Sequence, residues 1–120
     1  TINGDGSQSR DFTYIDNVIQ ANILAATTTN PDAINQVYNV ACGDQSFLRD
    51  LVEELKKLLS TFDSKINDVA IHFGSERIGD IKHSLASIEK AKKLLGYHPS
   101  HNVKKGLSAA IKWYWEYFTN

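Results

Sequence analysis

The stretch Gly4-Asp5-Gly6-Ser7-Gln8-Ser9-Arg10-Asp11-Phe12-Thr13-Tyr14-Ile15 decides how the rest of the chain is interpreted. Its two glycines begin like a dinucleotide-binding loop. That fingerprint requires a third glycine where Ser9 stands, and a helix directly afterwards. Here Phe12-Thr13-Tyr14-Ile15 follows, and its aromatic and β-branched residues are typical of a strand. The stretch therefore predicts a turn that presents side chains.

Two side chains of this stretch are candidates for binding an anion. Gln8 and Arg10 are two residues apart, so on an extended backbone they point the same way. The planar fork of an arginine matches the oxygens of a phosphate group. A solvated surface arginine without a ligand is an equally good interpretation of Arg10.

A second polar tract, Arg77-Ile78-Gly79-Asp80, offers related chemistry. Gly79 allows the backbone to turn tightly, and the Asp80 carboxylate has the acceptors to hold two ribose hydroxyls. A structural salt bridge between an arginine and an aspartate explains the same residues without any ligand. The sequence leaves both interpretations open.

The composition indicates one ordinary globular domain. The chain has 120 residues, 42% of them hydrophobic, which is enough for a modest core. A net charge of -1 gives no broad basic surface, so nucleic acid is not expected as a partner. The single Cys42 fits a reducing, cytoplasmic setting. No apolar run approaches the roughly 18 residues that span a membrane, so no membrane partner is expected.

The beginning of the chain is unusual for a complete protein. It contains no methionine and opens at Thr1-Ile2, directly on a strand-like residue. A complete gene product starts with methionine, although processing can remove it. We therefore expect an excised piece of a longer protein.

Periodicity and turn residues predict a mixed order of strands and helices. Strands are expected over residues 1–3, 10–15, 37–41 and 69–73, with a brief extended run at 81–85. Helices are expected over residues 17–27, 47–60, 88–95 and from 103 onward, with Asp16, Ser46 and Ser87 as N-caps and Gly96 as a C-terminal stop. The first helix is apolar around most of its circumference and should be largely buried. This order predicts an α/β or α+β fold.

Four tracts in this order resemble a known family. Residues 4–18, 37–41, 77–86 and 90–99 are similar to the segments GDGxQxRDFxYVxDV, VYNVG, RPGDxxxSxAD and KAxxxLGxxP. These segments are found in the C-terminal part of the extended short-chain dehydrogenases, among the NAD-dependent sugar-nucleotide epimerases and dehydratases. The resemblance covers nearly all of the chain and points towards UDP-N-acetylglucosamine 4-epimerases.

The resemblance implies an architecture. Residues 1–120 would be the C-terminal substrate-binding portion, α/β in the parent or α+β in isolation, and the N-terminal NAD-binding Rossmann domain would be absent. The helix from Asp16 and the strand at 37–41 would return to that domain. NAD is then expected in the parent and no cofactor in this chain. The parent would be a homodimer, and the fragment would self-associate through surfaces left uncovered.

The resemblance also implies roles for particular residues. Arg10 and Arg77 would grip the diphosphate of a UDP-sugar, and Asp80 would bond the uridine ribose. Gln8 would be a lesser contact beside the nucleotide. Ser84 matches a position that lines the sugar pocket, where a small residue implies tolerance of a 2-acetamido group. Ile78 stands where the family usually has proline.

The implied reaction is reversible inversion at C4 through a 4-keto intermediate. The family uses a tyrosine and a lysine four residues later, and no tyrosine here has that partner, so the fragment should be inactive alone. Alternatives are the same part of a nucleotide-sugar dehydratase or decarboxylase, a non-catalytic nucleotide-sugar binding module, and a purely structural α/β domain.

Two weaker candidates have ordinary explanations. His98 and His101 could bind a metal, but no third ligand has a suitable spacing, so no metal is expected. The aromatic run 113–118 could stack on sugars. The helical spacing of Tyr114 and Phe118 instead favours packing in the core.

Overall fold

A computed structural model describes residues 1–119. Its strands are very short: β1 Ile2–Asn3, β2 Ser9–Arg10, β3 Ser46–Phe47 and β4 Phe73–Gly74. Its helices are α1 Ile15–Thr27, α2 Leu48–Leu59, α3 Glu89–Leu95 and α4 Val103–Thr119, with 3₁₀ turns η1 Pro31–Ala33 and η2 Ser64–Asp68. The predicted mixture of helices and strands is confirmed.

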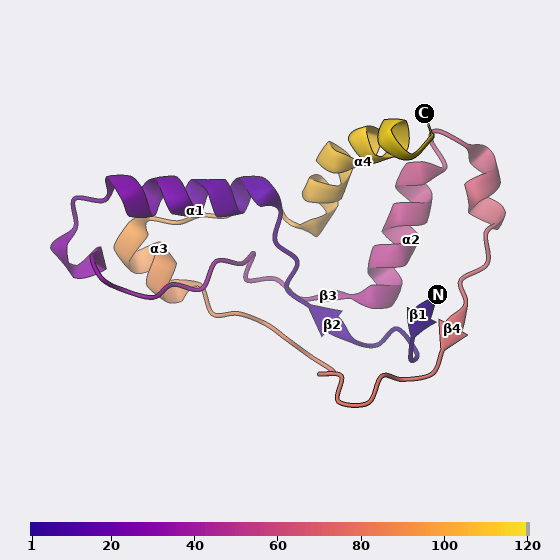
Figure 1. Ribbon diagram of the computed structural model, residues 1–120, viewed down its shortest axis with the longest axis horizontal. Helices are drawn as coiled ribbons and strands as arrows, with labels where there is room; N and C mark the ends of the chain where they lie inside the picture. The colour runs from indigo at the N-terminus through magenta and orange to yellow at the C-terminus, as the bar shows by residue number, and fades with distance from the viewer. Residues whose placement is uncertain (120) are drawn as a thin grey trace.

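The molecule is flat and elongated. It measures 54 × 35 × 19 Å, and its radius of gyration of 17.4 Å exceeds the about 14 Å expected for a compact domain of this length. Helices α1 and α3 lie at one end and α2 and α4 at the other, with β2 and β3 near the middle and β1 and β4 below α2 (Figure 1). A chain spread out in this way leaves much of its apolar surface in solvent.

Short backbone pairings join parts of the chain that are distant in sequence. Strand β1 pairs with β4 in parallel, with Ile2 opposite Phe73, and β2 pairs with β3 antiparallel. Beyond β4, the backbone N–H of Ser9 donates to Lys82 O at 2.9 Å, and that of Ser84 donates to Ser9 O at 3.1 Å. The segment between Phe73 and Ser84 is therefore held at both its ends by residues 2–9.

The core lies between α1 and α3 and is made mostly of small side chains. It contains Ala21, Ala41, Ile88, Ala91 and Tyr97. Tyr97 is fully buried, and its hydroxyl donates to the carbonyl oxygen of Ala41 at 2.7 Å. Burial raises the pKa of the Tyr97 hydroxyl, so this donor keeps its proton at neutral pH.

Asn17 joins α1 to the turn that precedes α4. Its side chain is fully buried. The amide nitrogen donates to His101 O at 2.7 Å, and the amide oxygen accepts from the backbone N–H groups of Ser100 at 2.9 Å and His101 at 3.1 Å. A buried polar side chain is tolerated only when its hydrogen bonds are made, and here both ends of the amide are satisfied.

The strand predictions at 10–15 and 37–41 were wrong. Residues 11–14 and 36–40 are irregular, and only Phe73–Gly74 of the predicted strand 69–73 pairs with a neighbour. Val37 is 85% exposed. A strand requires a partner for its backbone groups, and among residues 1–119 nothing forms a ladder with 37–41. Composition alone therefore overestimated the sheet.

The positions of the helices were predicted correctly, but the residues that cap their N-termini were not. All four helices form close to the expected bounds. However, α1 begins at Ile15, before the predicted cap Asp16, and α2 and α3 follow Phe47 and Ile88 without a side-chain cap. Gly96 ends α3 as predicted, in a left-handed conformation with φ of 69°.

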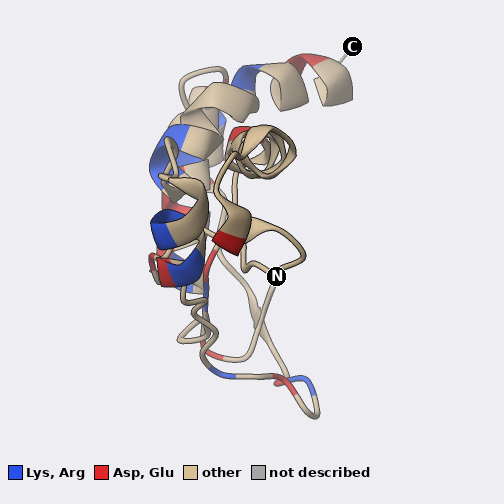
Figure 2. Ribbon diagram, turned by 90° about the vertical axis from the view of Figure 1, so that its left-hand side faces the viewer, with Lys and Arg blue, Asp and Glu red and all other residues tan. Residues whose placement is uncertain are grey.

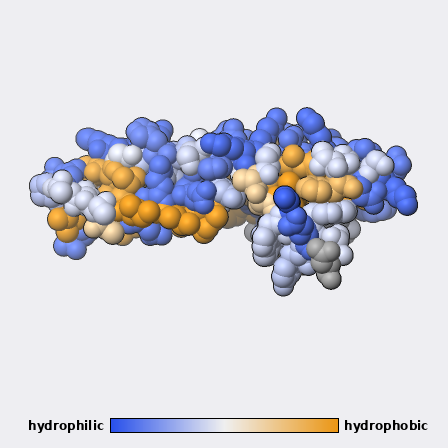
Figure 3. Space-filling view, turned by 90° about the horizontal axis from the view of Figure 1, so that it is seen from above, coloured by the Kyte–Doolittle hydropathy of each residue, from blue (hydrophilic) through white to orange (hydrophobic). Residues whose placement is uncertain are grey.

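Two helices expose the residues that were expected to be buried. Ile15, Ile19 and Ile23 of α1 are 58%, 48% and 57% exposed, and Figure 3 shows a hydrophobic band over this end of the molecule. On α4, Tyr114 and Phe118 are 50% and 75% exposed and stack on each other instead of entering a core. The prediction that these faces of α1 and α4 are buried was therefore wrong for this chain.

The surface charge is mixed. Figure 2 shows acidic and basic residues interspersed along the ribbon, in agreement with the net charge of -1. Within residues 1–119, no helix has the length and apolarity needed to cross a membrane.

Candidate functional site

Residues Arg77 to Asp80 form a tight turn on an exposed loop. The backbone N–H of Asp80 donates to Arg77 O at 3.2 Å. Gly79 has φ of 80°, whereas Ile78 has no positive φ, which is the pattern of a type II turn. A side chain at Gly79 would meet nothing within 4 Å, so its backbone conformation, and not space, explains the glycine.

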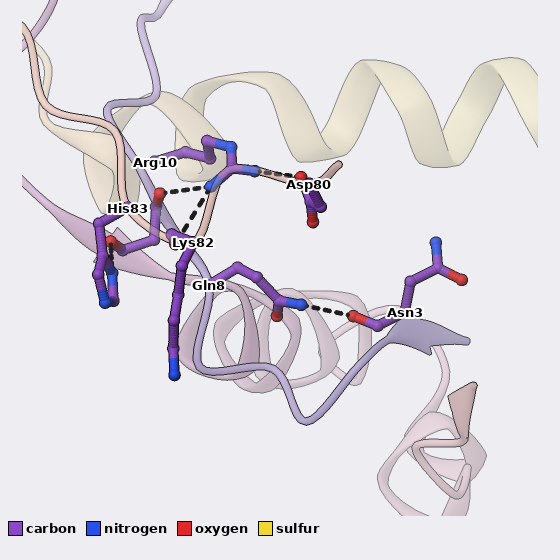
Figure 4. A network of polar contacts seen from close by, with 7 residues as sticks. Asn3, Gln8, Arg10, Asp80, Lys82 and His83 are labelled. Carbon is purple, nitrogen blue, oxygen red and sulfur yellow. Dashed lines mark hydrogen bonds and ion pairs between the residues drawn. The ribbon is translucent and has the colours of Figure 1, made fainter. Parts of the chain in front are cut away.

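Arg10 reaches this turn from β2 and is fixed by three acceptors (Figure 4). Its Nη2 donates to Asp80 Oδ1 at 2.7 Å, and its Nη1 donates to the carbonyl oxygens of Ser9 at 2.8 Å and Lys82 at 3.4 Å. The Arg10 and Asp80 side chains are 28% and 29% exposed. A structural salt bridge was one of the two interpretations of the tract 77–80. Asp80 does form one, but its partner is Arg10 of the first polar tract and not Arg77.

Arg77 has a different partner, Asn3 at the end of β1. With the Asn3 amide turned so that its oxygen faces the guanidinium, that oxygen accepts from Arg77 Nε at 2.8 Å and from Nη2 at 3.0 Å. Arg77 belongs to the exposed part of the loop. Both arginines therefore lie beside the same turn, each held in one orientation.

Gln8 is buried beside this cluster. Only 6% of it is exposed, and its Nε2 donates to the backbone oxygen of Asn3 at 2.9 Å (Figure 4). Among residues 1–119, no donor meets its Oε1, which is sealed from solvent. Gln8 and Arg10 leave the same strand region but end on different partners, and Gln8 supports the turn from within.

Ser84 lies on the exposed side of the same backbone pairing. Its N–H donates to Ser9 O at 3.1 Å. Beneath it, the fully buried Ser9 hydroxyl contacts His83 Nδ1 at 2.8 Å and accepts from Gln45 Nε2 at 2.6 Å. This network of Ser9, Gln45 and His83 fixes the extended run that carries Ser84. Sequence reasoning missed it because the three residues come from three distant segments.

The cluster as a whole combines features of an anion site. Arg10 lies about 70 residues before the segment that carries Arg77, Asp80 and Ser84, yet its ion pair with Asp80 and the backbone pairing of Ser9 with Lys82 and Ser84 hold it beside that segment. A ligand that carries phosphate can be recognised by two guanidinium groups, one carboxylate and an exposed serine hydroxyl. The two polar tracts that the sequence singled out thus meet in space.

A family comparison matches almost the entire chain. The family model described as GDP-mannose 4,6 dehydratase matches residues 1–110. The chain belongs to the GDP-mannose 4,6-dehydratase family. This confirms the resemblance to the extended short-chain dehydrogenases and their α/β fold class.

Among curated members, the chain is similar to UDP-sugar epimerases. It is 32% identical over 111 residues to an uncharacterized UDP-glucose epimerase of Bacillus subtilis, covering 92% of this chain and 33% of the relative. It is 31% identical over 113 residues to a UDP-glucuronate 4-epimerase of Thermodesulfobacterium geofontis, covering 93% and 32%. The chain thus spans about a third of the length of these relatives.

Solved structures of the family superpose well on the chain. A UDP-N-acetylglucosamine 4-epimerase of Methanobrevibacter ruminantium, in complex with UDP-N-acetylmuramic acid, gives a TM-score of 0.81 at 34% identity, covering 97% of this chain and 34% of that structure. A UDP-glucuronic acid 4-epimerase of Bacillus cereus, with UDP-glucuronic acid and NAD, gives 0.79 at 30% identity, covering 97% and 35%.

The glycine turn at residues 4–6 does not fit the phosphates of a dinucleotide cofactor. Gly4 and Gly6 both have φ of 77°, but strand β2 and not a helix follows them. A Cβ on Gly4 would lie 2.5 Å from Gln8 Nε2, and one on Gly6 would lie 3.2 Å from Arg49 Cβ. The chain's own side chains therefore fill the space at both glycines. Within residues 1–119, no three His, Cys, Asp or Glu side chains gather as metal ligands.

Proposed function

We propose that this chain is the UDP-sugar-binding part of an NAD-dependent UDP-hexose 4-epimerase. The observation that carries the proposal is the ion pair between Arg10 and Asp80, which brings Arg10 to the turn that also carries Arg77. Paired arginine forks suit the two phosphates of a nucleotide sugar, and a carboxylate suits its ribose hydroxyls. The similarity to epimerases whose structures contain UDP-sugars supports the same ligand class.

Each residue has one role in this proposal. Arg10 and Arg77 bind the diphosphate, and Asp80 accepts from the ribose. Gln8, expected from the resemblance to be a lesser contact, has both polar side-chain atoms buried, so its role is to support the turn from within. Ser84 faces the sugar, where its small side chain leaves room for a 2-acetamido group, so UDP-N-acetylglucosamine and UDP-N-acetylgalactosamine are the expected substrates. The 34% identity to a UDP-N-acetylglucosamine 4-epimerase supports this choice.

The chemical step belongs to the rest of the parent protein. We propose that residues 1–120 are its C-terminal substrate-binding portion and that the remaining length contains the NAD-binding domain. NAD supplies the oxidation and reduction that invert C4. This chain anchors the nucleotide, and that binding energy orients the sugar at the reacting carbon. Alone, it is expected to be inactive, and the parent is expected to be a cytoplasmic homodimer.

The family description also supports a second candidate, the same part of a nucleotide-sugar dehydratase. The two candidates differ in the nucleotide of their substrate, because the family description names a GDP-sugar whereas the relatives are named for UDP-sugars. Comparing UDP with GDP as ligands therefore tests both the ligand class and this alternative.

Calorimetry of the 120-residue chain with UDP, UDP-N-acetylglucosamine and GDP tests the proposal. We expect the uridine nucleotides to bind and GDP to bind more weakly. Arg77→Ala should weaken UDP binding about 10- to 150-fold, because a charge-assisted hydrogen bond contributes about 1.5–3 kcal/mol. The exposed Lys93→Ala, on α3, is the control and should leave binding unchanged.

Four results would contradict the proposal in different ways. Unchanged UDP affinity in Arg77→Ala would remove the role of Arg77. Preference for GDP would favour the dehydratase candidate. Absence of any nucleotide binding, with a folded chain, would leave only a structural α/β domain. Formation of product after adding NAD and UDP-sugar to this chain alone would disprove the proposed division of labour.

A further inference from the structure

Asn3 holds two of the residues assigned to the nucleotide site. With the Asn3 amide turned so that its oxygen faces the guanidinium, that oxygen accepts from Arg77 Nε and Nη2 at 2.8 and 3.0 Å, and the backbone oxygen of Asn3 accepts from Gln8 Nε2 at 2.9 Å. One residue thus fixes the guanidinium on one side and the glutamine amide on the other. The sequence alone did not suggest a role for Asn3, which lies just before the glycine turn.

The backbone of Asn3 is fixed by strand pairing. It is the last residue of β1, where it lies opposite Gly74 of β4, and it is partly buried. The next residue, Gly4, donates its N–H to Gly74 O at 3.0 Å. Backbone pairing before and after Asn3 therefore fixes the main chain from which its side chain reaches Arg77.

The two arginines of the site differ in charge compensation. Arg10 is paired with the Asp80 carboxylate at 2.7 Å, so its charge is already balanced in the unliganded chain. The acceptor for Arg77 is a neutral amide, and among residues 1–119 no carboxylate lies within 4.0 Å of its guanidinium. Of the five N–H donors of an arginine, Asn3 takes two, which leaves three directed elsewhere.

We propose that Asn3 is a positioning residue that orients Arg77 for the diphosphate without neutralising it. A free arginine side chain loses rotamer entropy when it binds a ligand, and a bidentate acceptor removes that cost in advance. A carboxylate would orient the guanidinium equally well but would compete with the phosphate for its charge. This inference rests on the proposed nucleotide site and adds a residue to it.

Two variants of Asn3 separate orientation from charge. Asn3→Asp has nearly the same shape, keeps an acceptor towards Arg77 and adds a negative charge. Asn3→Leu removes the acceptor without adding charge. If Asn3 were only structural, the isosteric Asp variant would be nearly harmless and Leu harmful. If Asn3 serves Arg77 as proposed, Asp is the more damaging change for a phosphorylated ligand.

The test compares UDP and uridine binding to the unmodified chain and to both variants by calorimetry. We expect Asn3→Leu to weaken UDP binding about 2- to 12-fold, as for a lost neutral hydrogen bond. Asn3→Asp should weaken it about 10- to 150-fold, as for a lost charge-assisted bond. Uridine, which lacks the diphosphate, should bind all three chains equally.

A ligand-free measurement decides the orientation separately. The Arg77 Nε–H resonance in the NMR spectrum should be observable and slowly exchanging in the unmodified chain and in Asn3→Asp, and lost in Asn3→Leu. Equal loss of UDP and uridine affinity, or UDP binding by Asn3→Asp as tight as by the unmodified chain, would overturn the inference. If no chain binds UDP, the proposed function fails, and a freely exchanging Arg77 resonance in the unmodified chain would also overturn the positioning role.

Discussion

At the scale of single residues, Asp11 has the clearest structural role among the carboxylates. Its Oδ1 accepts from the backbone N–H of Cys42 at 2.9 Å, and its Oδ2 accepts from that of Gly43 at 2.9 Å. Both hydrogen bonds are charge-assisted and join the segment after β2 to a distant turn. Asp11 thus links the site-bearing strand to the end of the molecule that contains the core.

Asp11→Ala should lower the free energy of unfolding by about 2 kcal/mol, because two backbone donors lose a charged acceptor. Urea unfolding followed by circular dichroism measures this. Burial, with the Asp11 and Asp44 carboxylates, raises the pKa of the Cys42 thiol, so the variant should also alkylate faster at mildly alkaline pH. Asp68→Ala, an exposed carboxylate in η2, is the control. A loss of stability no larger than that of the control would show that the Asp11 hydrogen bonds contribute nothing.

Sequence reasoning found the charged residues of the site more readily than their partners. Arg10, Arg77 and Asp80 stood out because their charged groups suit a phosphate and a ribose, and because the tracts that carry them resemble segments of a known family. The partners Asn3, Ser9 and Gln45 are common polar residues whose contacts come from distant segments. Asn17 was overlooked for the same reason, since nothing local distinguishes a buried, satisfied asparagine from an exposed one. Pairing over such separations is a property of the fold.

At the scale of elements, one substitution should make the turn 77–80 more stable. Ile78 occupies the second position of a type II turn, is fully exposed and donates no backbone hydrogen bond among those of residues 1–119. Proline is favoured at this position because its ring fixes the required φ. With isoleucine at this position, the unfolded chain has more conformational entropy to lose on folding than it would have with proline.

Ile78→Pro should stabilise the chain by about 0.4–1 kcal/mol, chiefly by reducing the entropy of the unfolded chain. Because the turn carries Arg77 and Asp80, UDP affinity should rise slightly or stay unchanged. Thermal unfolding and calorimetry of the variant measure both effects. Ile78→Ala is the control, since it removes the same side chain without fixing φ. A destabilised proline variant would contradict the assignment of the turn.

The core between α1 and α3 should depend on pH through Tyr97. Burial raises the pKa of its hydroxyl above the usual 10.0, so the unfolded chain loses this proton first as the pH rises. The contribution to stability is complete below the usual value and is lost as the pH rises towards the folded value. Unfolding free energies measured from pH 8 to 11 should therefore fall. The fall near pH 10 should be smaller in Tyr97→Phe, and an identical pH profile would refute this origin.

Elements differed in how well local sequence predicted them. A helix satisfies its own backbone, so periodicity placed α1 to α4 nearly correctly. A strand depends on a neighbour, and residues 37–41 have strand composition but no partner among residues 1–119. Cap predictions failed because Tyr14, Phe47 and Ile88, and not a polar side chain, precede the helices. Local sequence was therefore sufficient to predict the elements whose backbone hydrogen bonds are made within the element itself.

At the scale of the whole molecule, exposed apolar surface is the dominant feature. Ile15, Ile19 and Ile23 recur every four residues and form one stripe along α1. A stripe of this kind normally packs against another element, and contiguous apolar surface in water favours association. The flat shape of the molecule leaves the stripe accessible along its length (Figure 3).

We therefore expect the chain to self-associate in a concentration-dependent manner through the α1 stripe. The double variant Ile19→Lys, Ile23→Lys should weaken association at least about tenfold, because burial of each half-exposed isoleucine contributes about 1 kcal/mol or more and two lysines repel one another. Sedimentation velocity over a range of concentrations measures this. Ile78→Lys is a matched control, since Ile78 is also exposed but lies on the isolated turn far along the chain from α1. A chain that stays monomeric at high concentration, or a control that dissociates as much as the double variant, would contradict the role of the stripe.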